Sequence, residues 1–198
     1  DNEAAAEKAG HLLAKSLGNK GKVVMLNIAS DNPKSLDREK GFRKAIDQYL
    51  DMELVNIFDC NSSRANVSKT MEDILKAHPD VQGVFAACPE TSAGLVSSLI
   101  SLGKADDIKI VGFDHTAEIL NYISTGRISA YVGQNSYQLG YKAMKTALDI
   151  LTGQSVPEKV DVGYDIFEAE ESVDLLDLQD IHIEPDVTEN TEEVEPQG

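Results

Sequence analysis

The sequence predicts an α/β fold: an open parallel sheet with helices on both of its faces. Apolar residues switch several times between a period of two and a period of three to four, which is typical of strands that alternate with helices. The chain is also large enough, because 198 residues with 41% apolar content can cover a core. No internal repeat is visible beyond this alternation.

The first elements follow from helix caps, glycine stops and apolar runs. Asp1 and Asn2 favour a helix start, and Gly18 favours a helix end. The apolar face between them consists of Ala5, Ala9, Leu12, Leu13 and Leu17. A buried strand is expected at residues 23–29 and a helix at residues 35–50. The residues that this helix should present to the sheet are Phe42, Ala45, Ile46 and Tyr49 or Leu50.

The middle of the chain repeats the strand and helix pattern. A strand is expected at residues 54–58, and the next helix ends at the turn His78-Pro79-Asp80. That helix is marked by Val67, Met71, Ile74 and Leu75. Residues 81–87 predict a third strand, and Gly103 ends the helix that follows it. The apolar stripe of that helix is Leu95, Val96, Leu99 and Ile100.

The last part of the chain continues the alternation. Strands are expected at residues 108–113 and 128–132, separated by a short helix at residues 117–125 before Gly126. A helix from Tyr137 to Leu151, closed by Gly153, precedes an extended piece at residues 160–167.

The charge balance excludes several classes of partner. The formal net charge of −16, from 34 acidic and 18 basic residues, opposes binding to phosphate backbones or anionic lipid, so no direct nucleic-acid binding is expected of this segment. Much of the acidic excess lies in residues 171–198, which are expected to be a disordered, solvated tail.

Signals for export or membrane insertion are not found within the sequence itself. No apolar run approaches the ~18 residues of a membrane span, and a signal peptide of an exported parent would lie upstream of Asp1. Cys60 and Cys88 are too few for a disulfide framework and leave the redox compartment open.

Candidate site residues are sought at the carboxyl ends of the strands, where open parallel sheets bind ligands. Asp114 follows an apolar strand; it either lines the site or caps the helix that begins near Thr116. Gln134 also follows a strand, and its amide either faces a cleft or satisfies loop backbone groups. Arg38 is expected in the opening turn of a helix, where the dipole disfavours a cation, so it has a partner there or is neutralised by its acidic neighbours in the chain.

Catalytic, metal and cofactor sites find little support. Cys88 has no histidine near it in sequence and is expected to be a small buried thiol. The histidines are scattered without metal-ligand spacing: His11, His78, His115 and His182. Glycine-rich phosphate loops, Gly-x-Ser-x-Gly and Cys-x-x-Cys are absent from the sequence. No enzyme activity and no cofactor are therefore expected.

The order of several short fragments resembles one family. The fragments are Gly21-Lys22-Val23-Val24, Arg38-Glu39-Lys40-Gly41-Phe42, the run from Ala77 to Ala86, Val111-Gly112-Phe113-Asp114, Gly126, Gln134-Asn135 and Gly140-Tyr141. Together they resemble the type I periplasmic sugar-binding proteins of the ribose-binding kind and, more distantly, the effector domains of lactose-repressor-like regulators. The resemblance runs from Asp1 to about Val156.

The resemblance implies a domain division. In that family two lobes close on a sugar, and the chain enters the second lobe near a pair like Asp1-Asn2. Residues 1–134 would be the second, C-terminal lobe, and residues 135–157 a hinge return and a helix belonging to a first lobe that is largely missing here. Residues 158–170 would be a returning strand. The helix at 135–157 should then lack its natural packing partner.

The resemblance also implies a binding site. Arg38, Asp114 and Gln134 stand at the family's arginine, aspartate and glutamine positions, and their donors and acceptors suit a sugar or polyol. Cys88 and Ser62 are also expected among the ligand-binding residues. The sequence departs from the family at both: an Asn-Asp pair is common at Cys88, and Ser62 lies in the region where many relatives stack an aromatic ring on the sugar. Ribose specificity therefore does not follow from the resemblance.

The function that the resemblance implies is that of a substrate-binding protein. It would bind a sugar or polyol by hinge closure and serve an ABC transporter permease or a sensor kinase, outside the cytoplasm, in the periplasm or as a cell-surface lipoprotein. The alternative is the ligand-binding effector domain of a lactose-repressor-like transcription regulator. A signal peptide upstream favours the first and a helix-turn-helix the second. An enzyme on the same sheet is a third class, and no nucleophile–base pair in the sequence supports it.

Overall fold

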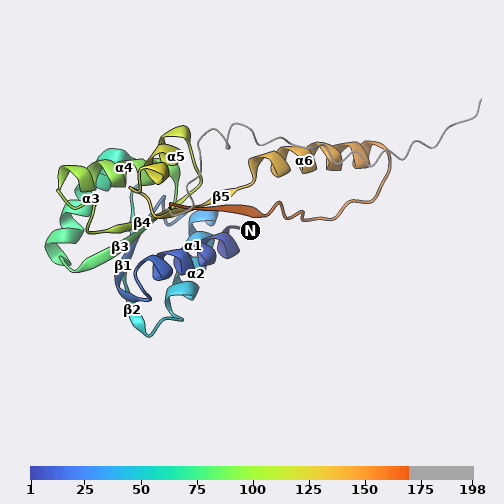
Figure 1. The fold of residues 1–198 in the computed structure, drawn as a ribbon. Coiled ribbons are helices and arrows are strands. Elements are labelled where there is room, and N and C mark those ends of the chain that lie inside the picture. Colours follow the sequence, from blue (N-terminus) through green and yellow to red (C-terminus); the bar gives the residue numbers. More distant parts are fainter. Residues whose placement is uncertain (170–198) are drawn as a thin grey trace, which may run out of the picture.

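The computed structural model describes residues 1–169 (Figure 1). The acidic tail expected at residues 171–198 lies outside the described residues. The helices are α1 (Asn2–Ser16), α2 (Pro33–Ile46), α3 (Arg64–Ala77), α4 (Pro89–Ser101), α5 (Ala117–Ser124) and α6 (Ser136–Leu151). The strands are β1 (Lys20–Asn27), β2 (Asp51–Asp59), β3 (Val81–Ala86), β4 (Lys109–Phe113), β5 (Ala130–Gln134) and β6 (Tyr164–Glu168). Every predicted helix and strand is present within a few residues of its expected ends.

The strands form one six-stranded sheet in the order β2-β1-β3-β4-β5-β6. Strands β1 to β5 are parallel, whereas β6 pairs antiparallel with β5. Parallel neighbours need a crossover on one face of the sheet, and helices supply these crossovers. The predicted fold class, an open and mainly parallel sheet with helices on both faces, is confirmed.

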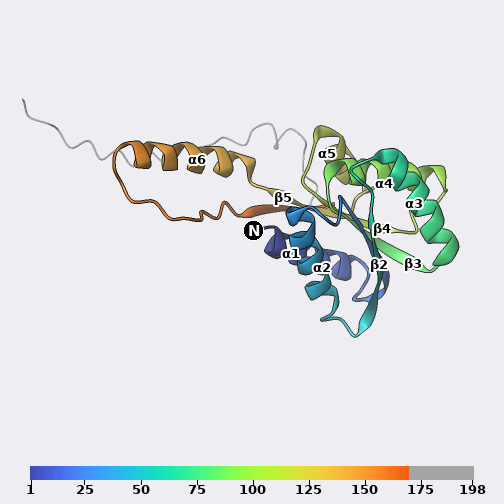
Figure 2. The ribbon, with the colours of Figure 1, turned by 180° about the vertical axis from the view of Figure 1, so that it is seen from behind.

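The two faces of the sheet carry separate cores. Helices α1 and α2 cover one face, and α3, α4 and α5 cover the other (Figures 1 and 2). On the first face Phe42 of α2 stacks on Phe85 of β3, with the ring centroids 4.8 Å apart. On the second face Met71, Leu95 and Tyr131 are fully buried. Burial on both sides explains why the strands are nearly continuous apolar runs.

Helices α1 and α2 approach each other very closely beside the carboxyl ends of the strands. The Asp1 carboxylate caps α1 by accepting a hydrogen bond from the backbone N of Ala4 at 3.0 Å, so Asn2 is the first helical residue. A Cβ atom added at Gly41 of α2 would lie 2.0 Å from the carbonyl oxygen of Glu3. Only glycine allows this approach, which brings the start of α1 next to α2.

Helix α2 is shorter at its C-terminal end than expected. It spans Pro33–Ile46, and the following residues form the turn into β2, which begins at Asp51. Leu50 is 101% exposed and does not face the sheet, so that expectation is wrong. Tyr49 lies outside the helix, and its hydroxyl makes a 2.9 Å hydrogen bond with His11 of α1. A helix that continued to residue 50 would leave no room to reverse the chain direction before the strand.

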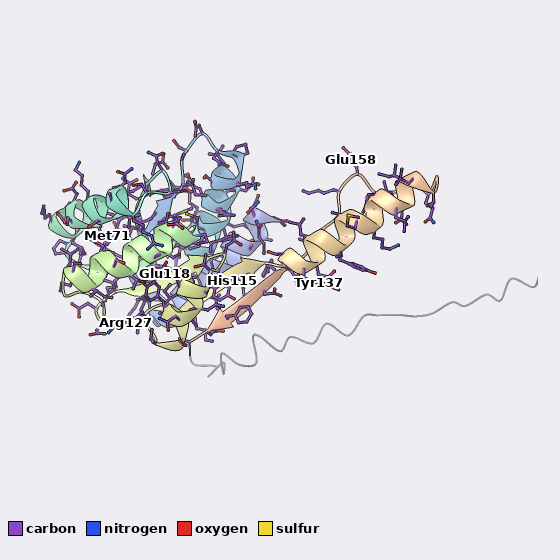
Figure 3. The ribbon with its side chains drawn as sticks, turned by 90° about the horizontal axis from the view of Figure 1, so that it is seen from above. Met71, His115, Glu118, Arg127, Tyr137 and Glu158 are labelled. Atoms are coloured by element: carbon purple, nitrogen blue, oxygen red, sulfur yellow. The ribbon has the colours of Figure 1, made fainter. Side chains whose placement is uncertain are left out.

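Helix α6 stands apart from the body of the protein (Figures 1 and 3). It contains no buried residue. Its apolar side chains are open to solvent, with Met144 74%, Leu148 60% and Leu151 84% exposed. Figure 3 shows Tyr137 at the end of α6 that is nearest to the body, and Glu158 in the return loop well away from it. The assignment of this helix to a first lobe remains a prediction.

Candidate functional site

Asp114 lies at the carboxyl end of β4 and faces the edge of the sheet. Its backbone adopts φ +59°, a left-handed conformation that aspartate tolerates better than most residues. Its Oδ1 accepts a hydrogen bond from the backbone N of Gln134 at 3.0 Å, which ties β4 to β5. Thr116, and not Asp114, caps α5. The capping alternative for Asp114 is therefore wrong, and its carboxylate is held at the rim of the sheet.

Arg38 extends from α2 across the same rim. Its guanidinium Cζ lies 3.8 Å from the centroid of the Phe113 ring, and its Nη1 donates to the carbonyl oxygen of Ala87. The residue is only 4% exposed. The expectation that Arg38 lies in the opening turn of its helix is wrong. Helix α2 begins at Pro33, so Arg38 lies in its second turn. The dipole argument therefore does not apply, since that effect falls off within the first turn.

The charge of Arg38 is balanced across the site. Its Nη2 lies 3.5 Å from Oδ2 of Asp114, whose side chain is 28% exposed. Burial lowers the pKa of the Arg38 guanidinium, and Asp114 opposes that shift. Arginine nevertheless stays charged in proteins. Glu39, which follows Arg38 in α2, forms an ion pair with Arg43 at 2.9 Å. The positive charge of Arg38 is therefore balanced by Asp114 and not by Glu39 of its own helix.

Gln134, at the end of β5, completes the cluster through Asn2. Its side-chain Nε2 donates to Oδ1 of Asn2 at 3.2 Å. The same oxygen accepts a hydrogen bond from Nε of Arg38 at 3.1 Å. The side chain of Gln134 thus bonds another side chain and not the loop backbone. Its place in a ligand site remains a prediction. The structure brings Arg38, Asp114 and Gln134 together. Asn2 also belongs to this cluster, although the sequence indicated it only as a residue that favours a helix start.

Ser62 and Cys88 lie together beside this cluster. Cys88 starts α4 and is 7% exposed, and its Sγ lies 3.1 Å from Oγ1 of Thr91 and 3.8 Å from Oγ of the exposed Ser62. The carbonyl that accepts from Arg38 belongs to the residue just before Cys88. Cys88 is thus a buried thiol, as expected. Cys60 is also buried, and burial raises its pKa to about 11.

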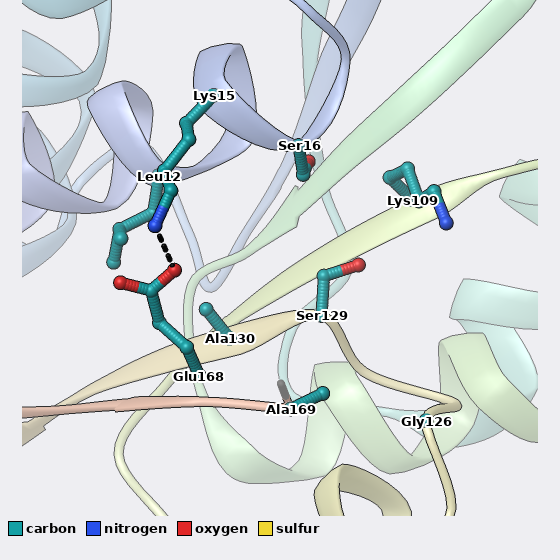
Figure 4. Close-up of a pocket in the computed structure, with 9 residues that line it drawn as sticks. All are labelled: Leu12, Lys15, Ser16, Lys109, Gly126, Ser129, Ala130, Glu168 and Ala169. Atoms are coloured by element: carbon teal, nitrogen blue, oxygen red, sulfur yellow. Dashed lines mark hydrogen bonds and ion pairs between the residues drawn. The ribbon is translucent and has the colours of Figure 1, made fainter. Parts of the chain in front are cut away.

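Three pockets in the described residues lie away from this cluster. One pocket of about 240 Å³ is found at the opposite end of the strands, where Lys109 begins β4 (Figure 4). Lys15 of α1 crosses it to pair with Glu168 of β6 at 2.6 Å. A second pocket, near Lys22, is at the same end, and a third borders the edge strand β2.

The fold and the cluster define a class of protein. Fixed polar groups from neighbouring elements converge at the carboxyl ends of parallel strands, which is where open α/β sheets hold small ligands. Small-molecule sites combine a few fixed polar groups such as carboxylate, guanidinium and amide groups, which are the groups gathered here. The fold is therefore that of an open α/β sheet, with a polar cluster at the edge where such sheets hold ligands.

The chain belongs to the periplasmic binding protein family, because the family model for the periplasmic binding protein domain matches residues 1–155. Its relatives confirm the resemblance to the type I periplasmic sugar-binding proteins. The ribose import binding protein of Escherichia coli K12 is 31% identical over 162 residues, 82% of this chain and 54% of that protein. The D-apiose import binding protein of Paraburkholderia graminis is 32% identical over 147 residues, 74% of this chain and 47% of that protein.

Solved structures agree with this membership. The glucose-galactose binding protein of Geobacillus stearothermophilus matches with a TM-score of 0.82 and 27% identity, over 86% of this chain and 61% of that chain. A solute-binding protein of Agrobacterium radiobacter in complex with D-arabinose matches with a TM-score of 0.81 and 25% identity, over 89% and 62%. The chain spans about half the length of the curated relatives that it matches.

These relatives are sugar-binding transport proteins and not enzymes, in agreement with the expectation of a chain without catalytic residues. None of the helices in residues 1–169 combines the length and the apolar character that a membrane crossing requires.

Proposed function

We propose that this chain is the second lobe of an exported solute-binding protein that holds a sugar or similar polyol for an ABC transporter. The observation that carries the proposal is the cluster of Arg38, Asp114 and Gln134. An ion pair joins Arg38 to Asp114, the Gln134 backbone donates to Asp114, and Asn2 accepts hydrogen bonds from Arg38 and Gln134. Relatives named for ribose import, for D-apiose import and for D-ribose and D-allose binding support the choice of ligand and of transporter. That choice places the protein outside the cytoplasm, like the import binding proteins it resembles.

The cluster offers what adjacent hydroxyl groups require. The Asp114 carboxylate only accepts hydrogen bonds, Arg38 only donates them, and the Gln134 amide does both. Asp114 would accept from two neighbouring hydroxyls while Arg38 donates to a ring or hydroxyl oxygen. Such groups reject an analogue that lacks a hydroxyl, because a buried partner would then go unpaired.

The small side chains of Ser62 and Cys88 would face the less polar part of the ligand. The Ser62 hydroxyl is exposed, whereas the Cys88 thiol is turned toward Thr91. Neither side chain can stack on a sugar ring as an aromatic residue does. The proposed site therefore has more room here than a site walled by a ring, and we expect it to accept sugars with a bulkier substituent at this position.

Closure of two lobes would complete the site. In this proposal residues 1–134 form one lobe, and residues 135–157 carry the chain into the other, against which the exposed apolar side chains of α6 would pack. The return segment of the proposed division, residues 158–170, would bring the chain back, and within it β6 pairs with β5. A ligand that bridges both lobes would favour the closed state, which a transporter would recognise.

Isothermal titration calorimetry of the full-length protein against pentoses, hexoses and their polyols tests the proposal. We expect saturable binding of at least one sugar, lost by two orders of magnitude or more when Asp114 is changed to Ala, because a charge-assisted hydrogen bond is removed and Arg38 is left unpaired. The matched control is Asp106→Ala, which removes a 96% exposed carboxylate paired with Arg127 outside the cluster. No binding of any polyhydroxylated compound would refute the proposal.

A further inference from the structure

Asn2 joins the two sides of the proposed binding site through a single oxygen atom. Its Oδ1 accepts from Nε of Arg38 at 3.1 Å and from Nε2 of Gln134 at 3.2 Å. An amide oxygen has two lone pairs, so both are used. The residue stands at the first position of α1, and its contacts reach α2 on one side and the end of β5 on the other.

The chemistry of Arg38 fixes the direction of these hydrogen bonds. A guanidinium can only donate, so the atom of Asn2 that faces Nε must be the oxygen and not the nitrogen. The group of Gln134 that faces this oxygen must then be its NH₂ group, since two amide oxygens would repel each other. The Oε1 atom of Gln134 is consequently left as the free end of that amide. Arg38 thus determines the orientation of Gln134 through Asn2.

The backbone that carries Asn2 is held firmly in place. The contact between Gly41 of α2 and the carbonyl of Glu3 fixes the start of α1 against α2. Arg38 is itself fixed by its contacts with Ala87 and Phe113. A rigid support of this kind is what a site needs in order to distinguish ligands by the position of one hydroxyl.

We propose that Asn2 is a positioning residue that sets the hydrogen-bond direction of the Gln134 amide, so that Gln134 presents an acceptor to a donating hydroxyl of the ligand. This inference rests on the proposed sugar-binding function. It assigns to Asn2 a role in specificity: the site prefers a hydroxyl at this position over a deoxy or fluoro group, neither of which can donate. Without Asn2 the Gln134 amide can rotate, and the preference is lost.

Three variants of the full-length protein separate this role from a structural one. Asn2→Ala removes the shared acceptor, and we expect the affinity for the preferred sugar to fall about tenfold or more. Asn2→Asp keeps an acceptor facing both donors and should recover most of that loss. Asp1→Ala removes the helix cap one residue away, so it should lower the melting temperature but leave the affinity unchanged.

The decisive readout is selectivity measured by calorimetry. For each variant the dissociation constant of the preferred sugar is compared with those of its monodeoxy and monofluoro analogues. In Asn2→Ala the ratio for one position should approach one, and Gln134→Ala should abolish the same discrimination without further loss in the double variant. Unchanged ratios in Asn2→Ala, or fully additive losses in the double variant, would overturn the inference.

A measurement on the ligand-free protein separates failure of this inference from failure of the proposed function. Nuclear magnetic resonance follows the Nε–H proton of Arg38 and the amide protons of Gln134. We expect slow exchange of these protons in the parent protein and in Asp1→Ala, and faster exchange in Asn2→Ala. If the parent binds no sugar, the proposed function fails, and the ligand role of Asn2 fails with it. If sugar binds but the exchange in Asn2→Ala is unchanged, only the role of Asn2 is refuted.

Discussion

Replacing Asp114 with Asn removes the negative charge that faces Arg38 and changes little else. Asparagine tolerates the φ of +59°, and its oxygen can still accept from the backbone N of Gln134. For charges separated by the observed 3.5 Å, the Coulomb energy is about 5 kcal/mol at an effective dielectric constant of about 20 and about 1 kcal/mol in water. Because the carboxylate is 28% exposed, we expect a loss between these limits, about 2 kcal/mol of unfolding free energy.

Urea unfolding of this chain, followed by circular dichroism, measures that loss. The midpoint should shift to lower urea while the slope of the transition stays the same. Asp106→Asn is the matched control, because its 96% exposed carboxylate should contribute less than about 1 kcal/mol. If Asp114→Asn is as stable as the parent protein, the pair with Arg38 is not an energetic contact, and the account of a preformed site is wrong.

Three further substitutions test other parts of the structure. Gly41→Ala should cost about 1–3 kcal/mol in urea unfolding, because its Cβ would lie 2.0 Å from the Glu3 carbonyl, and an unchanged midpoint would contradict the close helix contact. Leu148→Lys should change the stability of this chain by less than about 0.5 kcal/mol, since the side chain is 60% exposed, but destabilise a two-lobed protein by about 2 kcal/mol or more. Burial raises the pKa of the Cys60 thiol from 9.0 to about 11 in the folded state. As the pH rises above about 9, the thiol therefore loses its proton in the unfolded chain before it does so in the folded protein. Stability should therefore fall between pH 9 and 11 by up to about 1.4 kcal/mol per pH unit, and Cys60→Ala should reduce that slope.

The order of helices and strands could be predicted because its signals are local. Glycine and proline end the helices, and continuous apolar runs mark strands that are buried on both faces. The C-terminal end of α2 was misplaced, because Leu50 continues the apolar pattern although the chain has already turned toward β2. The antiparallel pairing of β6 has no local signal, since it depends on the long return through α6.

The candidate site was predictable in its members but not in its connections. Arg38, Asp114 and Gln134 follow recognisable fragments, and the structure places them together. Asn2 was missed because asparagine at this position is explained by a helix start. Its hydrogen-bond partners, moreover, lie 36 and 132 residues away in the chain. Contacts over such separations arise only when the strands are placed side by side, which no pattern within one segment shows.

A crystal structure of the full-length protein with its tightest-binding sugar tests the central claim most directly. The account predicts ligand oxygen atoms within about 3.2 Å of the Arg38 guanidinium, the Asp114 carboxylate and the Gln134 amide. It also predicts that α6 is buried against a first lobe. A sugar bound elsewhere, with none of these three side chains in contact with it, would contradict the account.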